Sequence, residues 1–200
     1  GFRIPPEDLN LSGACLRKQN FSRCIFNGTN FAGAALKDVD FSSSTFVCCK
    51  FDGANLRGAN LAGVRVDGCS WNRAYLRDAK ISADAFRQMV ESGLIVDARL
   101  EGAIVVIDAE QLITRAIRRM TGITENISFE LSSGTQSEIL VTLNDNNPQV
   151  GLAVVNSRIR EIERNIIPFI LRHVISVATE DGSQIRPPSE IEDFCLDAER

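Results

Sequence analysis

The most constraining feature of this sequence is a strict five-residue periodicity between Leu11 and Ile81. Every fifth residue in this stretch is large and apolar, which gives fifteen such residues without a gap, and the residue two places before each is mostly small. An α-helix repeats every 3.6 residues and a strand every two, so neither explains a period of five. The large residues are Leu11, Leu16, Phe21, Phe26, Phe31, Leu36, Phe41, Phe46, Phe51, Leu56, Leu61, Val66, Trp71, Leu76 and Ile81. The pattern predicts a repeat architecture.

A second period of twenty residues is superimposed on the first. The four-residue blocks that begin at Ala14, Ala34, Ala54 and Ala74 align with one another. Because four fives make twenty, the chain returns to the same side after four pentapeptides, which predicts a square coil with the large and small residues inside. Stacked coils are expected at the strand spacing of about 4.8 Å. The predicted interior columns include Leu16, Leu36, Leu56 and Leu76, and Leu11, Phe31, Phe51 and Trp71.

Two neighbouring pentapeptides, Ala54–Gly58 and Ala59–Gly63, read Ala-Asn-Leu-Arg-Gly and Ala-Asn-Leu-Ala-Gly. They match the A(D/N)Lxx pattern, so residues 9–81 resemble the pentapeptide-repeat family. The resemblance implies a right-handed quadrilateral β-helix, a solenoid, without implying one function.

The five-residue pattern breaks after Ile81 and then resumes. Residues 82–92 are expected to form a short helix that Ser82 caps and Gly93 ends. Residues 94–107 return to the register and are expected to close the solenoid as a last partial coil. We therefore expect a mainly β fold with an α-rich C-terminal part: a β-helix over residues 1–107 with an inserted helix near 83–92, and a helical domain over residues 108–200.

Beyond residue 107 the repeat is absent. Asp108–Gln111 looks like a reciprocally capped helix start. Residues 137–143 are an apolar run that suits a strand or a short buried helix, and a turn follows over residues 144–148. Residues 149–178 are expected to be helical, in one piece or in two divided near Pro168, and polar residues 179–190 to form a loop.

The hexapeptide Ile139-Leu140-Val141-Thr142-Leu143-Asn144 is similar to an I-L-x-T-(M/I/L)-(N/D) segment of the secreted HECT-like ubiquitin ligases of enteric bacterial pathogens. In those effectors the segment follows a pentapeptide β-helix and precedes the ligase lobes. The similarity in layout covers roughly residues 80–170. It implies a recognition part of such an effector, without the catalytic lobe.

Bulk properties are those of a globular protein. Hydrophobic residues make up 44% of the 200-residue chain, and the longest apolar stretches, such as Ala103–Ile107, are too short to span a bilayer. No signal peptide is visible. The expected location is the cytoplasm, or a host-cell cytosol for a secreted effector. The chain opens at Gly1 without Met, so we expect a fragment or a processed form.

Residues with catalytic or metal-binding chemistry are sparse. Six Cys occur without CxxC spacing, and His173 is the only His, so we expect no metal site, no cofactor and no catalytic set. Cys195 stands close to Glu192 and Asp193, and neighbouring acids disfavour a thiolate. Cys49 and Cys69, twenty residues apart, are expected to stack inside the solenoid as small buried hydrophobes.

Charge is distributed unevenly. Residues 1–83 carry 11 Lys and Arg against 7 Asp and Glu, a balance of +4, and residues 84–200 carry 11 against 19, a balance of −8. Four basic residues each follow an inward Leu and should project from one side: Arg17, Lys37, Arg57 and Arg77. This row is either a solvated face, in which Asp38 and Asp78 reduce the repulsion between like charges, or a basic ladder for an acidic partner. Tyr75 is the main outward aromatic residue beside it.

Three functions are to be considered for such a solenoid. The favoured one is a non-catalytic module that binds another protein, with a host protein as one candidate. A DNA mimic that binds gyrase, as in the quinolone-resistance pentapeptide proteins, would need an acidic solenoid, and this one is basic. The third function, that of an enzyme, would need a set of catalytic residues that this sequence does not show. Nucleic acid is not an expected partner, because outward aromatic surface is scarce, and the oligomeric state stays open.

We therefore expect no hydrolase, transferase or redox activity from these 200 residues. The most direct assay incubates the chain with a ubiquitin-charged E2 enzyme and resolves products on a non-reducing gel. A thioester of ubiquitin on Cys195 would contradict the prediction, and Cys195→Ser is the control.

Overall fold

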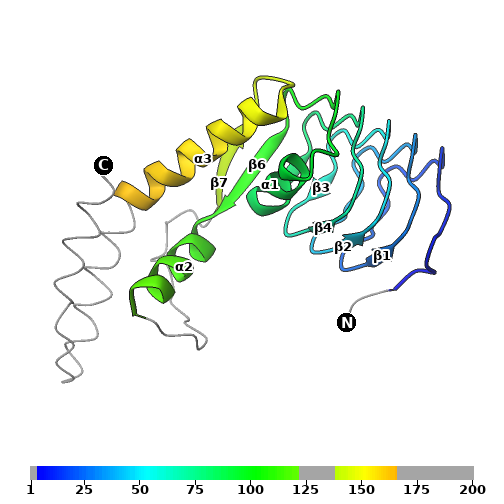
Figure 1. The fold of residues 1–200 in the computed structure, drawn as a ribbon. Coiled ribbons are helices and arrows are strands. Elements are labelled where there is room, and N and C mark those ends of the chain that lie inside the picture. The colour runs from blue at the N-terminus through cyan, green and yellow to red at the C-terminus, as the bar shows by residue number, and fades with distance from the viewer. Residues whose placement is uncertain (1–3, 122–137, 166–200) are drawn as a thin grey trace. The chain divides into compact units, whose positions relative to one another are not determined.

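The computed structural model describes residues 4–121 and 138–165 (Figure 1). The chain forms two compact units. The first contains the residues up to Ile107 together with Glu138–Val155, and the second contains the remaining described residues, 108–121 and 156–165. Each unit is described below by itself, and the repeats lie in the first.

Coils of the first unit pair with one another in parallel at an offset of twenty residues. The paired residues recur at four positions of a coil, as in Asn30 with Lys50, Ala35 with Asn55, and Asp40 with Asn60. At the fourth position the strands β1 (Ile25–Asn27), β2 (Thr45–Val47) and β4 (Arg65–Asp67) form a parallel three-stranded sheet in the order β1-β2-β4. The predicted solenoid with four pentapeptides to a coil is confirmed (Figure 1). Its right-handedness stays a prediction.

A second sheet runs along another side of the solenoid in the order β3-β5-β6-β7. Its strands are β3 (Asn60–Leu61), β5 (Lys80–Ser82), β6 (Ile104–Asp108) and β7 (Glu138–Thr142). β3 pairs with β5 at the usual offset of twenty residues, whereas β5 pairs with β6 at an offset of 24. The offset is four residues larger because helix α1 (Ala83–Glu91) lies between β5 and β6 in the chain. The predicted break and the return of the register over residues 94–107 are thereby confirmed.

Helix α1 leaves directly from β5 and packs against β4, the last strand of the three-stranded sheet. It buries Phe86, Met89 and Val90, as its spacing predicts. Ser82 occupies the N-cap position, but its side chain makes no capping hydrogen bond, so that expectation is wrong. Ser82 is also the last residue of β5, where it pairs with Val106, and the helix is held there by the sheet and by its buried face.

The core consists of the predicted columns. Leu36, Leu56 and Leu76 are fully buried in one, and Phe31, Phe51 and Trp71 in another. The aromatic rings stack from coil to coil, with centroids 4.9 Å apart for Phe31 and Phe51 and 4.1 Å apart for Phe51 and Trp71. The first-coil members, Leu11 and Leu16, are only half-buried, because their coil has a neighbour on one side alone.

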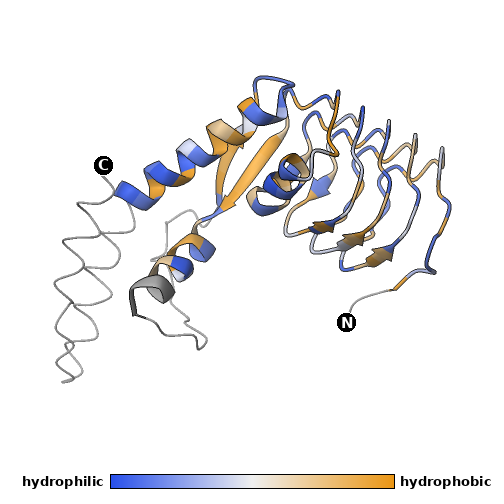
Figure 2. Ribbon diagram, in the orientation of Figure 1, coloured by the Kyte–Doolittle hydropathy of each residue, from blue (hydrophilic) through white to orange (hydrophobic). Residues whose placement is uncertain are grey.

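The expected domain boundary at residue 107 needs correction, because residues 138–155 return to the solenoid unit. The apolar run over residues 137–143 supplies β7, a strand rather than a helix, and β7 lies beside β6 in the sheet; Figure 2 shows both as largely apolar. The Leu143 amide donates to the Ala103 carbonyl at 2.8 Å, and the Leu143 carbonyl accepts from the Gly102 amide at 2.8 Å. A last coil exposes unpaired backbone groups, and this segment satisfies them.

Two longer helices complete the described residues. Helix α2 (Ala109–Thr121) begins where the sequence predicts, with the Gln111 amide donating to Asp108 Oδ1 at 3.1 Å. Helix α3 (Pro148–Asn165) follows the predicted turn, and the Gln149 amide donates to Asn147 Oδ1 at 3.0 Å. The expected continuation to residue 178, Pro168 and the loop over residues 179–190 lie outside the described residues. Within residues 4–121 and 138–165, no helix has both the length and the apolar character of a membrane span.

We predict that Leu56→Arg unfolds the solenoid. Leu56 is fully buried, and an unpaired guanidinium in a column of Leu side chains costs several kcal/mol. Thermal unfolding followed by circular dichroism measures the effect. The control is Asn55→Arg at the exposed neighbouring position, which should cost about 1 kcal/mol through the lost Asn55 hydrogen bond to the Arg57 amide. A wild-type melting temperature for Leu56→Arg would contradict the interior placement.

Candidate protein-interaction surface

The four basic residues expected to form a ladder do lie on one side of the solenoid. All four are exposed, and each follows a Leu of the interior column. The parallel register, which pairs Cys15 with Ala35, Ala35 with Asn55 and Asn55 with Tyr75, places them on successive coils. We call this row the basic ladder, and it consists of Arg17, Lys37, Arg57 and Arg77.

Local backbone geometry positions the ladder at a corner of the coil. The residue after each ladder member has a positive φ, between 57° and 68°, which turns the chain toward the next side. Gly58 takes this left-handed conformation without penalty, whereas Lys18, Asp38 and Asp78 adopt it with a side chain. On the third coil, Asn55 Oδ1 also accepts a hydrogen bond from the Arg57 amide at 3.2 Å. The ladder is therefore carried on a defined turn.

Two ladder members have acidic partners. Lys37 Nζ lies 3.9 Å from Asp38 Oδ2, as the sequence suggests. Asp78, however, pairs with Arg57 of the preceding coil, at 3.2 Å, and not with its neighbour Arg77. All four side chains of these pairs are about half exposed, so each pair is worth at most about 1 kcal/mol. Within the part of the chain that the structure describes, Arg17 and Arg77 have no ion pair.

Tyr75 is exposed to 43% and lies beside the ladder, as expected. Its ring contacts Arg99 of the next coil, whose guanidinium carbon is 5.3 Å from the ring centroid, a cation–π arrangement. Sequence reasoning missed Arg99 as a surface candidate because α1 shifts its offset from Tyr75 to 24 residues. The small-x-large register of Ala98-Arg99-Leu100 is the signal that could have found it.

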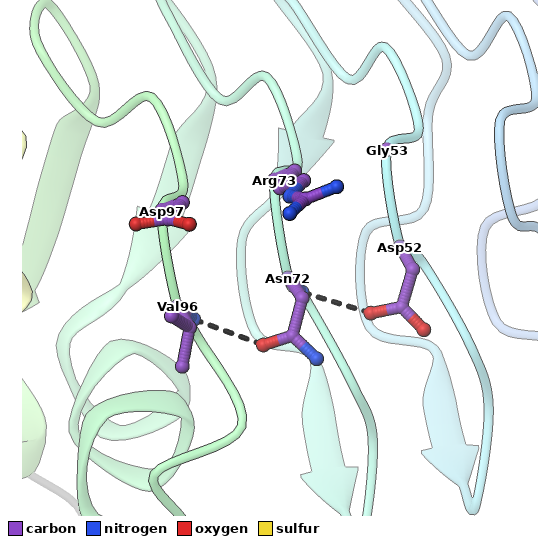
Figure 3. A pocket seen from close by; sticks show the side chains of 6 residues that line it. All are labelled: Asp52, Gly53, Asn72, Arg73, Val96 and Asp97. Atoms are coloured by element: carbon purple, nitrogen blue, oxygen red, sulfur yellow. Dashed lines mark hydrogen bonds between the residues drawn. The ribbon is translucent and has the colours of Figure 1, made fainter.

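A shallow groove lies at the neighbouring corner of the same coils (Figure 3). A row of hydrogen bonds crosses it: the Asn72 amide donates to Asp52 Oδ1 at 2.9 Å, and the Val96 amide donates to Asn72 Oδ1 at 3.0 Å. Arg73 and Asp97 line the groove on adjacent coils. Because Asp52 and Asn72 already bond to the backbone, the groove is a rigid polar surface and offers no nucleophile with a base.

The other chemical candidates within the described residues give no site. Cys49 and Cys69 are buried on adjacent coils as predicted, and their thiols donate to the carbonyls of Val47 and Asp67 at 3.4 and 3.3 Å. The hydrogen bond with Cys69 and burial raise the pKa of Cys49, so this thiol stays protonated at neutral pH. Among the described residues no group of His, Cys, Asp and Glu is arranged to hold a metal ion. His173 and Cys195 lie outside those residues.

Comparisons with known proteins match a family model and several solved structures to parts of this chain. A family model described as "Pentapeptide repeat region" matches residues 19–90. No curated protein matches the chain. Among solved structures, a pentapeptide repeat protein from the thylakoid lumen of Arabidopsis thaliana is 27% identical, with a TM-score of 0.38, over 39% of this chain and 54% of that one. A pentapeptide repeat protein from the cyanobacterium Cyanothece is 20% identical, with a TM-score of 0.26, over 50% of this chain and 85% of that one. HetL, from the cyanobacterium Nostoc, is 19% identical, with a TM-score of 0.20, over 51% and 63%. The chain thus spans about half the length of the first of these structures.

We predict that Asp78→Asn changes the free energy of unfolding by less than about 1 kcal/mol, because the Arg57–Asp78 pair is half exposed. Chemical denaturation at low and at moderate salt measures it, with Asp38→Asn as the matched variant on the Lys37 pair. A loss of more than about 2 kcal/mol would show instead that this pair holds the two coils together.

Proposed function

We propose that this chain is a non-catalytic module that binds another protein through the basic ladder. A family model of the pentapeptide repeat region matches residues 19–90. Pentapeptide-repeat proteins generally act in protein interactions. The observation that carries the proposal is the row of four exposed basic side chains on successive coils. The partner surface that fits this row is acidic.

Rigidity favours binding at this side. Each inner coil is hydrogen-bonded to a coil on both sides, so the outward side chains are spaced before any partner arrives. Association then orders few groups, which lowers its entropic cost. Charge complementarity would mainly speed association and select the partner.

A folded acidic protein suits the ladder better than nucleic acid does. Tyr75 is the main aromatic residue on this side, so few rings are available for stacking with bases. The net charge of the whole chain is −4, which also disfavours a polyanion. The excess of basic residues in residues 1–83 likewise argues against a DNA mimic that binds gyrase.

A second, more specific proposal concerns the class of protein to which the chain belongs. We propose that it is the recognition part of a bacterial secreted effector related to the HECT-like ubiquitin ligases, and that its partner is a host protein. The support is the hexapeptide Ile139–Asn144, which forms most of β7 and follows a pentapeptide solenoid, as in those effectors. The sequence of the full-length gene tests this: a ligase lobe encoded after residue 200 supports it, and a stop codon there contradicts it.

We predict that the double variant Arg57→Glu/Arg77→Glu weakens partner binding by at least about tenfold at low salt and slows association. Both side chains are exposed, so the fold should survive. The partner is first isolated with the full chain as bait, and its affinity and association rate are then measured by surface plasmon resonance.

The matched control is Arg65→Glu/Lys80→Glu. It makes the same change in net charge on other sides of the solenoid, where Arg65 lies on β4 and Lys80 on β5. If the ladder binds the partner, the control retains most of the affinity. Equal affinity for the wild type and the ladder variant at low salt would show that the ladder is only a solvated face.

A further inference from the structure

The last two coils carry a regular pattern of charge around Tyr75. Tyr75 and Arg99 pair across these coils, so the residues two places before and after them lie at matching corners. Both flanking residues are basic on the coil of Tyr75, and both are acidic on the coil of Arg99. We call these residues the Tyr75 patch: Arg73, Tyr75, Arg77, Asp97, Arg99 and Glu101.

The four flanking charges have no ion-pair partner among the described residues. Arg73, Arg77, Asp97 and Glu101 are all exposed, and within residues 4–121 and 138–165 none of them makes an ion pair. Figure 3 shows Arg73 and Asp97 on adjacent coils with no bond between them. This differs from the middle of the ladder, where Lys37 and Arg57 have acidic partners. Among the described residues nothing neutralises these four charges, so they are available to a partner of complementary charge.

The arrangement is complementary to itself. Consider a twofold axis that lies in the plane of this side, runs along the strand direction and passes between the two coils. Rotation about it places the coil of Tyr75 in one copy opposite the coil of Arg99 in the other. Arg73 then faces Asp97, Arg77 faces Glu101 and Tyr75 faces Arg99, and each contact occurs twice, as in any isologous interface.

We propose that the Tyr75 patch binds a second copy of this chain and forms a twofold dimer in which the two solenoid axes run in opposite directions. A patch of one charge sign would repel its own copy, whereas a basic row beside an acidic row attracts it. The outward residues at the Tyr75 position of the first three coils, Cys15, Ala35 and Asn55, are uncharged, so they add no charge repulsion of their own. Arg and Tyr, together with Trp, are also enriched among the residues that contribute most to binding energy at interfaces.

The dimer is expected to be weak and dependent on concentration and salt. The patch covers only two coils, so we expect it to bury less surface than a standard interface, which buries about 800 Å² per partner. Its contacts are mainly between exposed charges, which salt screens. Self-association should therefore appear at high protein concentration and low ionic strength.

The dimer and the proposed partner binding share Arg77, but other residues allow each to be tested separately. Arg17 and Lys37 belong to the ladder but lie on the first two coils, away from the Tyr75 patch, and Glu101 belongs to the patch but not to the ladder. Arg17→Glu/Lys37→Glu therefore tests the partner site alone, and Glu101→Arg tests the dimer alone.

Sedimentation velocity over a concentration series of the full chain at low salt tests the dimer. Arg77→Glu and Glu101→Arg should each weaken self-association at least about tenfold, because each places like charges opposite one another twice. An equimolar mixture of the two variants should recover a dimer, since the mixed pair has two Arg–Glu contacts. Arg65→Glu, on another side, should associate like the wild type.

Three results would overturn the proposal: a wild-type chain that stays monomeric at every concentration, single variants that associate like the wild type, or a mixture that does not recover a dimer. Melting temperatures confirm that each variant is folded. If one of the pair does not fold, Arg73→Asp and Asp97→Arg provide the same experiment at the opposite corner of the patch.

Discussion

Parallel hydrogen bonding between coils twenty residues apart is the interaction on which the rest of this structure depends. On the third coil, for example, the Asn55 amide donates to the Ala34 carbonyl of the coil before, and the Leu56 amide donates to the Tyr75 carbonyl of the coil after, both at 2.9 Å. Each side of an inner coil is thus hydrogen-bonded to the coil before it and to the coil after it. The Leu and aromatic columns inside and the charged rows outside follow from this one register.

The same interaction makes the end of the solenoid costly, because a last coil exposes backbone groups that need partners. The protein meets this need with segments from other parts of the chain. Helix α1 covers β4, β7 joins the sheet beside β6, and Asn146 Oδ1 accepts from the amides of Leu100 and Glu101 at 2.8 and 2.9 Å. Residues 138–155 therefore belong with the repeats although they follow them by thirty residues.

On such a solenoid, the surface available for binding depends on which residues recur at the same position of successive coils. One row repeats a basic residue on four coils, which suits an acidic partner. On the last two coils the flanking rows change from Arg to Asp or Glu, which suits a second copy. Both surfaces are open and rigid, and binding is the function that we propose for this side of the protein.

By itself, the sequence determined the solenoid, its interior columns and the exposed position of the ladder, because a period of five with inward Leu leaves one choice of side for each residue. It also located the break near α1. Only the tertiary structure decided that Asp78 pairs with Arg57, that Arg99 covers Tyr75 and that residues 138–155 close the last coil. The reason is physical: a repeat determines which side a residue occupies, whereas pairing across coils depends on side-chain reach and on an offset that changes from 20 to 24 residues once α1 is inserted.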